Sequence, residues 1–277
     1  MYIPKGGVTL ENEPIEQIRM GIQGFYGTGK TIAASTFPNP VYMDIDRGLG
    51  ALSGRSDIIK LKFYDNDFCK QINPNHKGFN TLRDTVLMFL DKEAKKLEAD
   101  QTLVVDGSTG LQNAYHAWYD ENPVVTKTGS IDDRAVWRLK LNFFGDICET
   151  LKTLRCNVLY IAHEYEKPDS SGEYNGKIRP LMSGQFCNQL GSHFNIWVRQ
   201  LTASKPKEDK IDDKLCAKWG KTKSEFIQML SMWPRDTMYF WKLDSDDTFD
   251  GKISSLKSFP SFIPATYQSL KALLETK

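Results

Sequence analysis

The sequence lacks several features that would place it in a specialised class. Its five cysteines are odd in number and form no C-x-x-C pair, so we expect neither a disulfide framework nor a zinc ribbon. No run approaches the roughly 18 apolar residues that span a bilayer, and the first residues contain no apolar signal segment. Charge is balanced, with 36 Lys and Arg against 35 Asp and Glu, so affinity for a polyanion would need local clusters. We expect an unsecreted protein that is cytoplasmic and contacts no membrane.

Short runs of strand-forming residues alternate with helical stretches from residue 15 onward. The chain has 277 residues, of which 40% are hydrophobic and 26% charged, enough for a sizeable core. We expect strands at 17–23, 41–43, 58–63, 102–106, 157–163 and 194–201, and longer helices at 79–97 and 133–154. Such alternation is typical of βαβ units, so the predicted fold class is α/β, with a mostly parallel central sheet and helices on both faces.

The alternation stops after residue 202. A lysine-rich stretch at 204–214 is followed by a short predicted helix at 224–230, a strand at 238–243 and a terminal helix at 267–274. We therefore expect an N-terminal segment at 1–14, a core at 15–202, and a small C-terminal extension at 203–277 that docks on the core.

A glycine-rich motif follows the first predicted strand. Gly24, Phe25, Tyr26, Gly27, Thr28, Gly29, Lys30 and Thr31 match G-x-x-x-x-G-K-[ST] at every fixed position. Glycine lets consecutive backbone N–H groups turn toward a phosphate, and the following helix adds the positive end of its dipole. Lys30 would neutralise β- and γ-phosphate oxygens, and the Thr31 hydroxyl would ligate Mg²⁺. The motif predicts a site for ATP or ADP with Mg²⁺; the alternative is a glycine turn that matches by chance.

Acidic residues end two of the predicted strands. Asp106 ends an apolar strand, where it could hold a Mg²⁺-bound water; the alternative is a helix cap or turn residue. Asp44 and Asp46 end the strand that comes after the glycine-rich motif and its helix, and their spacing places both on one face. Asp46 is the candidate to polarise the attacking water. The alternative is that both are solvated turn acids.

His163 ends another predicted buried strand. A polar side chain there could sense the γ-phosphate and pass its presence to the following loop; the alternative is a structural histidine. The three other histidines show no ligand spacing, so we interpret them as surface or packing residues.

The ordered set GFYGTGKT, VYMDID, TLVVDG and VLYIAHE resembles the RecA-like P-loop ATPases. It is most similar to the short phage-encoded nucleotide-binding and single-strand annealing proteins that have a RecA-like core only, over residues 15–201. The resemblance implies that Asp46 activates water, where the family usually has Glu, and that Asp106 lies on the metal side. It also implies that His163 is the polar sensor, where the family commonly has Gln. The implied catalytic set is Lys30, Asp46, Asp106 and His163.

The resemblance also implies contacts with single-stranded DNA. The polar segment 164–180 reads as a mobile hairpin or loop and is similar to the DNA-contacting loop that follows the sensor. It carries Lys167, Lys177 and Arg179, which could neutralise phosphates, beside tyrosines that could stack on bases. The same composition suits any exposed loop. The segment 118–138 occupies the place of the family's other DNA loop; the alternative is a connector.

RecA-like proteins usually assemble and complete the catalytic site with a cation from a neighbouring subunit. The resemblance therefore implies a homo-oligomer, ring or filament, with Arg179, Arg199, Lys205, Lys207 and Lys242 as unranked candidates. The expected function is ATP hydrolysis on single-stranded DNA in recombination, annealing or replication, in the host cytoplasm if the protein is phage-encoded. Two alternatives stay open: a nucleotide-dependent assembly switch with little hydrolysis, and a P-loop kinase acting on a small acceptor.

Overall fold

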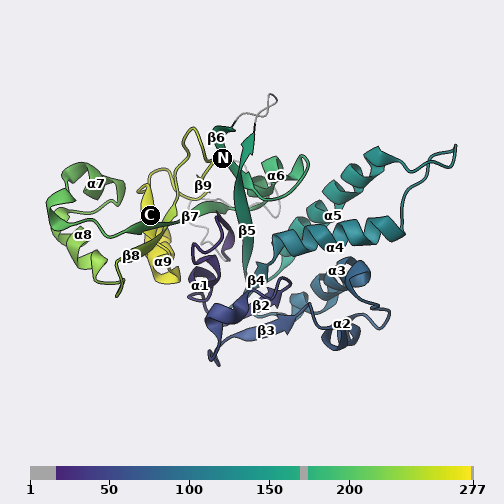
Figure 1. Cartoon of the computed structure of the whole chain (residues 1–277). Helices are drawn as coiled ribbons and strands as arrows, with labels where there is room; N and C mark the ends of the chain where they lie inside the picture. Colours follow the sequence, from purple (N-terminus) through teal and green to yellow (C-terminus); the bar gives the residue numbers. More distant parts are fainter. Residues whose placement is uncertain (1–16, 169–173, 276–277) are drawn as a thin grey trace, which may run out of the picture.

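The computed structural model describes residues 17–168 and 174–275, and these form one continuous sheet with helices around it (Figure 1). The strand order is β10-β8-β7-β1-β5-β4-β2-β3, with β6 paired to β5 and β9 paired to β7. The parallel strands are β3 (Ile59–Lys62), β2 (Pro40–Asp44), β4 (Thr102–Asp106), β5 (Asn157–Pro168), β1 (Arg19–Gly24) and β7 (Ile196–Ser204). The antiparallel additions are β6 (Tyr174–Pro180), β8 (Thr237–Lys242), β9 (Lys252–Ile253) and β10 (Phe262–Pro264).

Helices cover both faces of this sheet. They are α1 (Lys30–Ala34), α2 (Asn66–Ile72), α3 (Leu82–Lys92), α4 (Ser108–Glu121), α5 (Asp133–Thr153), α6 (Phe186–Gln189), α7 (Asp213–Lys218), α8 (Lys223–Leu230) and α9 (Tyr267–Glu275). On β4, Leu103 and Val105 pack with α3, α4 and α5, whereas Val104 packs on the opposite face with α1 and α9. Both faces are apolar, which explains the continuous hydrophobic runs of the central strands. The predicted α/β fold class is confirmed.

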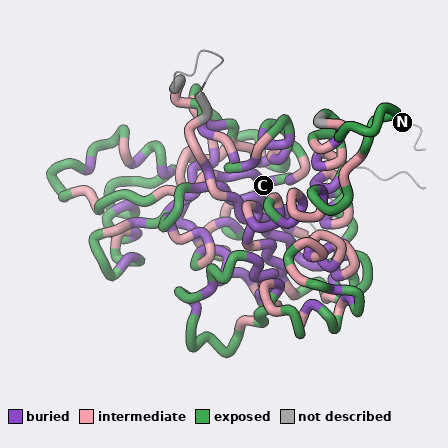
Figure 2. The backbone as a smooth tube through the Cα atoms, turned by 45° about the vertical axis from the view of Figure 1, so that its right-hand side comes forward, coloured by how far each residue is buried: buried purple, intermediate pink, exposed green. Residues whose placement is uncertain are grey.

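Buried residues gather along the sheet and its flanking helices, whereas the outlying loops are exposed (Figure 2). A third apolar cluster lies outside the main core, between α7, α8 and β8, and includes Trp219, Phe226 and Phe240. Residues beyond 202 thus extend the sheet and add a small core of their own, while the division at residue 202 stays a prediction. Among the residues that the structure covers, no helix is long and apolar enough to cross a membrane.

Several local predictions were wrong in detail. The predicted helix at 79–97 is α3 flanked by short 3₁₀ turns at Phe79–Thr81 and Ala94–Lys96, and these turns extend its amphipathic pattern. The helix α4 was not predicted, because its first turn, Ser-Thr-Gly, has poor helix propensity. The polar segment 164–180, by contrast, was predicted as a hairpin or loop, and the hairpin is confirmed in its described residues: part of the segment continues β5 and returns antiparallel as β6.

Candidate nucleotide site

The glycine-rich motif joins β1 to α1 at the carboxyl edge of the sheet. Gly27 and Gly29 have φ values of 78° and 83°, in the left-handed region that favours glycine. Gly24 is required for another reason, because a Cβ atom there would lie 2.8 Å from the carbonyl oxygen of Gln200. The loop therefore has a backbone conformation suited to binding phosphate, and replacing these glycines by residues with a side chain would disrupt it.

Lys30 is buried beneath this loop. Its Nζ donates hydrogen bonds to the carbonyl oxygens of Gly24, at 2.8 Å, and Phe25, at 2.9 Å. Burial lowers the pKa of Lys30 to about 8, against the opposing effect of Asp106 and then Glu164. The loop thus holds the ammonium group where phosphate oxygens would compete with its carbonyls.

Thr31 and Asp106 face each other beside the loop. The Thr31 hydroxyl donates a hydrogen bond of 3.0 Å to Oδ2 of Asp106, which ends β4. Burial raises the pKa of Asp106 to about 6, opposed by the Thr31 hydrogen bond. A hydroxyl and a carboxylate are hard oxygen ligands, so these residues fit Mg²⁺ and would hold it together with phosphate oxygens. When bound, the ion would neutralise phosphate charge.

Asp46 lies on the same edge but is directed at the start of α4. Its carboxylate accepts a hydrogen bond from the backbone of Gly110, and a Cβ atom at Gly110 would lie only 2.1 Å from Oδ1. Burial is the main cause that raises the pKa of Asp46. Asp44, by contrast, pairs with Lys60 at 2.9 Å and accepts a hydrogen bond from the backbone of Gly48. Asp44 therefore braces the strand end, and only Asp46 reaches α4.

His163 lies opposite Gly24 in the register of β1 and β5. Its Nδ1 is 3.4 Å from Nζ of Lys30, and its ring stacks with Tyr26 at a centroid distance of 5.8 Å. Burial, and then the charge of Lys30, lowers the pKa of His163. The structure thus brings together all four residues predicted to be catalytic, and their individual roles stay predictions.

Sequence reasoning missed a buried ion pair next to this group. Glu164 accepts hydrogen bonds from Nε of Arg199 at 3.0 and 3.1 Å, and Gln23 donates to it at 3.3 Å. In the sequence, the one signal that could have pointed to Glu164 was its position directly after His163. Tyr239, from β8, was also missed: a Cβ atom at Gly29 would lie 3.0 Å from its ring. No local pattern connects residues so far apart in the sequence.

The other predicted cations lie away from this group or have partners. Arg179, on β6, pairs with Asp250 at 3.3 Å, and Lys242 pairs with Asp244 at 2.7 Å. Lys177 is exposed on β6, whereas the side chain of Lys167 lies outside the described residues. Since Arg199 pairs within its own chain, its assignment to a neighbouring site would require that this pair opens.

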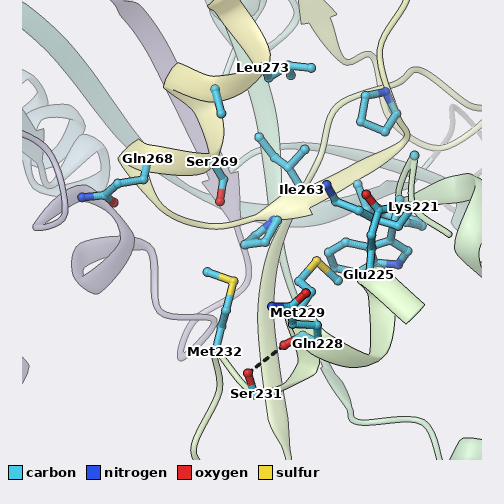
Figure 3. A pocket seen from close by; sticks show the side chains of 16 residues that line it. Lys221, Glu225, Gln228, Met229, Ser231, Met232, Ile263, Gln268, Ser269 and Leu273 are labelled. Carbon is cyan, nitrogen blue, oxygen red and sulfur yellow. Dashed lines mark hydrogen bonds between the residues drawn. The ribbon is translucent and has the colours of Figure 1, made fainter. Parts of the chain in front are cut away.

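A pocket of about 820 Å³ lies between α8, β10 and α9 (Figure 3). Met229, Met232, Ile263 and Leu273 supply much of its apolar lining. None of the candidate catalytic residues lines this pocket, so we assign it no part in nucleotide binding.

The raised pKa of Asp106 leads to a testable pH dependence. Below about pH 6 the carboxyl group is mostly protonated in the ligand-free protein, and a cation must displace that proton. We therefore expect Mg²⁺–nucleotide affinity to fall as the pH drops through about 6, with proton release on binding near that pH. Without ligand, the folded protein binds the Asp106 proton more tightly than the unfolded chain does. The contribution of Asp106 to the free energy of unfolding therefore falls as the pH rises from 3.8 to about 6. Titration calorimetry in buffers of different ionisation enthalpy measures the proton release.

Nucleotide phosphates also release protons when Mg²⁺ binds, and the variant Asp106→Asn is the control for that contribution. The variant should bind more weakly at pH 7.5 and lose the part of the proton release that Asp106 supplies. Equal proton release by both proteins would contradict the assignment of Asp106 to the metal side.

The sheet, the P-loop and the Thr31–Asp106 pair define a nucleotide-binding protein of the P-loop ATPase class. A family model described as an AAA domain matches residues 16–202, which is more than half of the chain, and the chain belongs to that family. Among curated proteins, none matches it.

Solved structures with limited likeness include an ATPase from the type III secretion system of pathogenic bacteria, at 10% identity and a TM-score of 0.38. That match covers 66% of this chain and 50% of the other, so the chain spans about half the length of the secretion ATPase. The RadB recombinase is similar at 15% identity and a TM-score of 0.34, with 68% of this chain and 76% of that chain covered.

Proposed function

We propose that the protein hydrolyses ATP and uses the nucleotide state to control its grip on single-stranded DNA, as a phage-type RecA-like protein in recombination, annealing or replication. The observation that carries the proposal is the convergence of Lys30, Thr31, Asp106, Asp46 and His163 at one sheet edge. A P-loop alone binds phosphate, whereas hydrolysis also requires a group that orients water. Asp46 supplies that group in this proposal.

Each residue has a distinct part in the proposed reaction. Lys30 moves its hydrogen bonds from the loop carbonyls to the β- and γ-phosphate oxygens, while Thr31 and Asp106 hold Mg²⁺. Asp46 accepts the Gly110 N–H and also accepts a hydrogen bond from the attacking water. His163 touches Lys30 and leads into the β5–β6 hairpin, so a change at the γ-phosphate reaches the hairpin through it.

A pocket beside the hairpin supports the DNA contact. Its lining, called here the Trp137 pocket, consists of Trp137, Arg138, Lys140, Leu141, Ser183, Gly184, Gln185 and Phe186, around about 430 Å³. Its lining contains exposed Arg138, buried Lys140, no acidic side chain and an indole that is 49% exposed. Cations beside an exposed aromatic ring suit the phosphates and bases of a single strand. Lys177 and Arg179 lie on β6, and the chain runs from there into this pocket.

The proposal includes an assembly, because transition-state charge on the γ-phosphate is best stabilised by a further cation. In this proposal that cation comes from a second copy; Arg199 and Lys242 would have to leave the acidic partners of their own chain to supply it. Specific activity should rise with protein concentration, as a ring or filament forms. If specific activity did not change with protein concentration and the protein stayed monomeric, this part of the proposal would be wrong.

Phosphate release with and without single-stranded DNA tests the proposed function. We expect release without any added acceptor, stimulated by single-stranded DNA, which a small-molecule kinase would not show. Arg138→Met should raise the DNA concentration for half-maximal stimulation about tenfold, because Arg138 is the exposed cation of this pocket and would lose one charge-assisted hydrogen bond. The control is Lys152→Met, because Lys152 lies at the far end of α5 and pairs with Glu149. Absence of stimulation, or equal effects of both variants, would contradict the DNA assignment.

One observation favours a second function, a nucleotide-dependent assembly switch with little hydrolysis. Asp46 is one methylene shorter than the usual Glu, and α4 already holds its carboxylate. Comparing the turnover of the natural protein with that of Asp46→Asn distinguishes the two functions. A natural protein as slow as the variant would favour the switch.

A further inference from the structure

The start of α4 is fixed to the nucleotide site by Asp46. The carboxylate lies so close to Gly107 and Gly110 that Cβ atoms there would stand 3.1 Å and 2.1 Å from its oxygens. The backbone of Gly110 donates a hydrogen bond to it. Any group that draws Asp46 toward the nucleotide therefore acts directly on the first turn of this helix.

Gln112 lies two residues further along α4 and holds the floor of the Trp137 pocket. Its single Oε1 atom accepts hydrogen bonds from Nζ of Lys140 at 2.7 Å, from the backbone N of Ser183 at 2.7 Å and from the Ser183 hydroxyl at 3.2 Å. These donors come from α5 and from the segment after β6. One oxygen thus joins α4 to both walls of the pocket.

Lys140 makes this junction sensitive to small movements. It is only 2% exposed, and its ammonium donates to neutral acceptors, namely Gln112 and the Ser183 hydroxyl, with Nε2 of His116 at 3.3 Å. Burial lowers its pKa to about 8. A buried ammonium group that loses an acceptor is costly, so Lys140 and Ser183 must follow when Gln112 moves.

We propose that Gln112 is a positioning residue that couples occupancy of the nucleotide site to the shape of the Trp137 pocket. When bound nucleotide and its water engage Asp46, the first two turns of α4 shift as a unit, and Gln112 carries Ser183 and Lys140 with it. This route runs through α4 and is separate from the contact of His163 with the hairpin. By linkage, a ligand in the pocket changes nucleotide affinity by the same factor. The part of this proposal that concerns DNA rests on the proposed function.

Amide hydrogen exchange at Ser183 tests the coupling without DNA, because that N–H donates to Gln112 directly. A non-hydrolysable ATP analogue with Mg²⁺ should change the Ser183 exchange rate severalfold in the natural protein. The response should disappear in Gly110→Ala, which separates Asp46 from α4, while Ser183 without nucleotide exchanges as before. Gln185→Leu is the matched control, since Gln185 is exposed in the same pocket, and it should keep the response. No response in the natural protein, or an undiminished one in Gly110→Ala, would overturn the proposal.

A second arm measures single-strand affinity with and without the analogue. The natural protein should show a ratio of about tenfold, within the usual range of coupling. Gln112→Leu should reduce the ratio to within twofold of one, and Gln112→Glu, which keeps an acceptor oxygen, should restore it. A ratio that persists in Gln112→Leu would overturn the proposal. If the natural protein binds no single strand, the proposed function fails, and the Ser183 measurement still decides the coupling.

Discussion

Lys30→Ala is expected to weaken the binding of ATP with Mg²⁺ at least about 100-fold. A charge-assisted hydrogen bond contributes about 1.5 to 3 kcal/mol, and Lys30 is placed to make two with phosphate oxygens, so the loss approaches 3 kcal/mol or more. Among the described residues, its ammonium donates to two loop carbonyls and touches His163, so the fold should survive the substitution. Titration calorimetry with a non-hydrolysable analogue measures the change.

Lys92→Ala is the control, because Lys92 is an exposed lysine at the end of α3. It should bind nucleotide as the natural protein does, and both variants should unfold at similar denaturant concentrations. If Lys30→Ala kept its affinity within a few-fold while remaining folded, the phosphate site would have to lie elsewhere.

The second large effect is expected for Gly110→Ala. The new methyl group would stand 2.1 Å from Oδ1 of Asp46 and 2.7 Å from Cγ2 of Ile45, so the carboxylate must move. A displacement of about 1 Å at a positioning group can cost 100-fold in rate. We expect turnover to fall about 100-fold while nucleotide affinity changes only a few-fold, because Asp46 orients water and does not hold the phosphates. Steady-state phosphate release and calorimetry together separate the two quantities.

Gly145→Ala provides the matched control. Gly145 lies within α5, where a Cβ atom would meet nothing within 4 Å. The substitution should therefore leave turnover unchanged and stabilise the fold by up to about 1 kcal/mol through helix propensity. Equal turnover of the two alanine variants would show that the contact between Asp46 and α4 has no part in hydrolysis.

The nucleotide site was largely predictable from the sequence because its essential contacts are local or lie at strand ends. Lys30 bonds to Gly24 and Phe25, within six residues of itself. The apolar strand before Asp106 places that carboxylate at the carboxyl edge of a parallel sheet, where the P-loop must also lie. Periodicity and one motif therefore sufficed to bring Lys30 and Asp106 together.

The features that sequence reasoning missed depend on contacts between distant segments. Gln112 meets Lys140 and Ser183 across separations of 28 and 71 residues, and no pattern along the chain specifies such partners. Arg199 illustrates the same limit: as a cation it suggested a contact with a neighbouring subunit, and folding instead pairs it with buried Glu164. Burial and pairing are properties of the assembled fold, so the hydrophobic pattern could not assign them.

A crystal structure of the complex with a non-hydrolysable ATP analogue and Mg²⁺ would test the central claim most directly. The account predicts β- and γ-phosphate oxygens within hydrogen-bond distance of Lys30, with the metal ion beside Thr31 and Asp106 and the terminal phosphate facing Asp46. Nucleotide bound away from the P-loop, or a metal ion remote from Asp106, would contradict it.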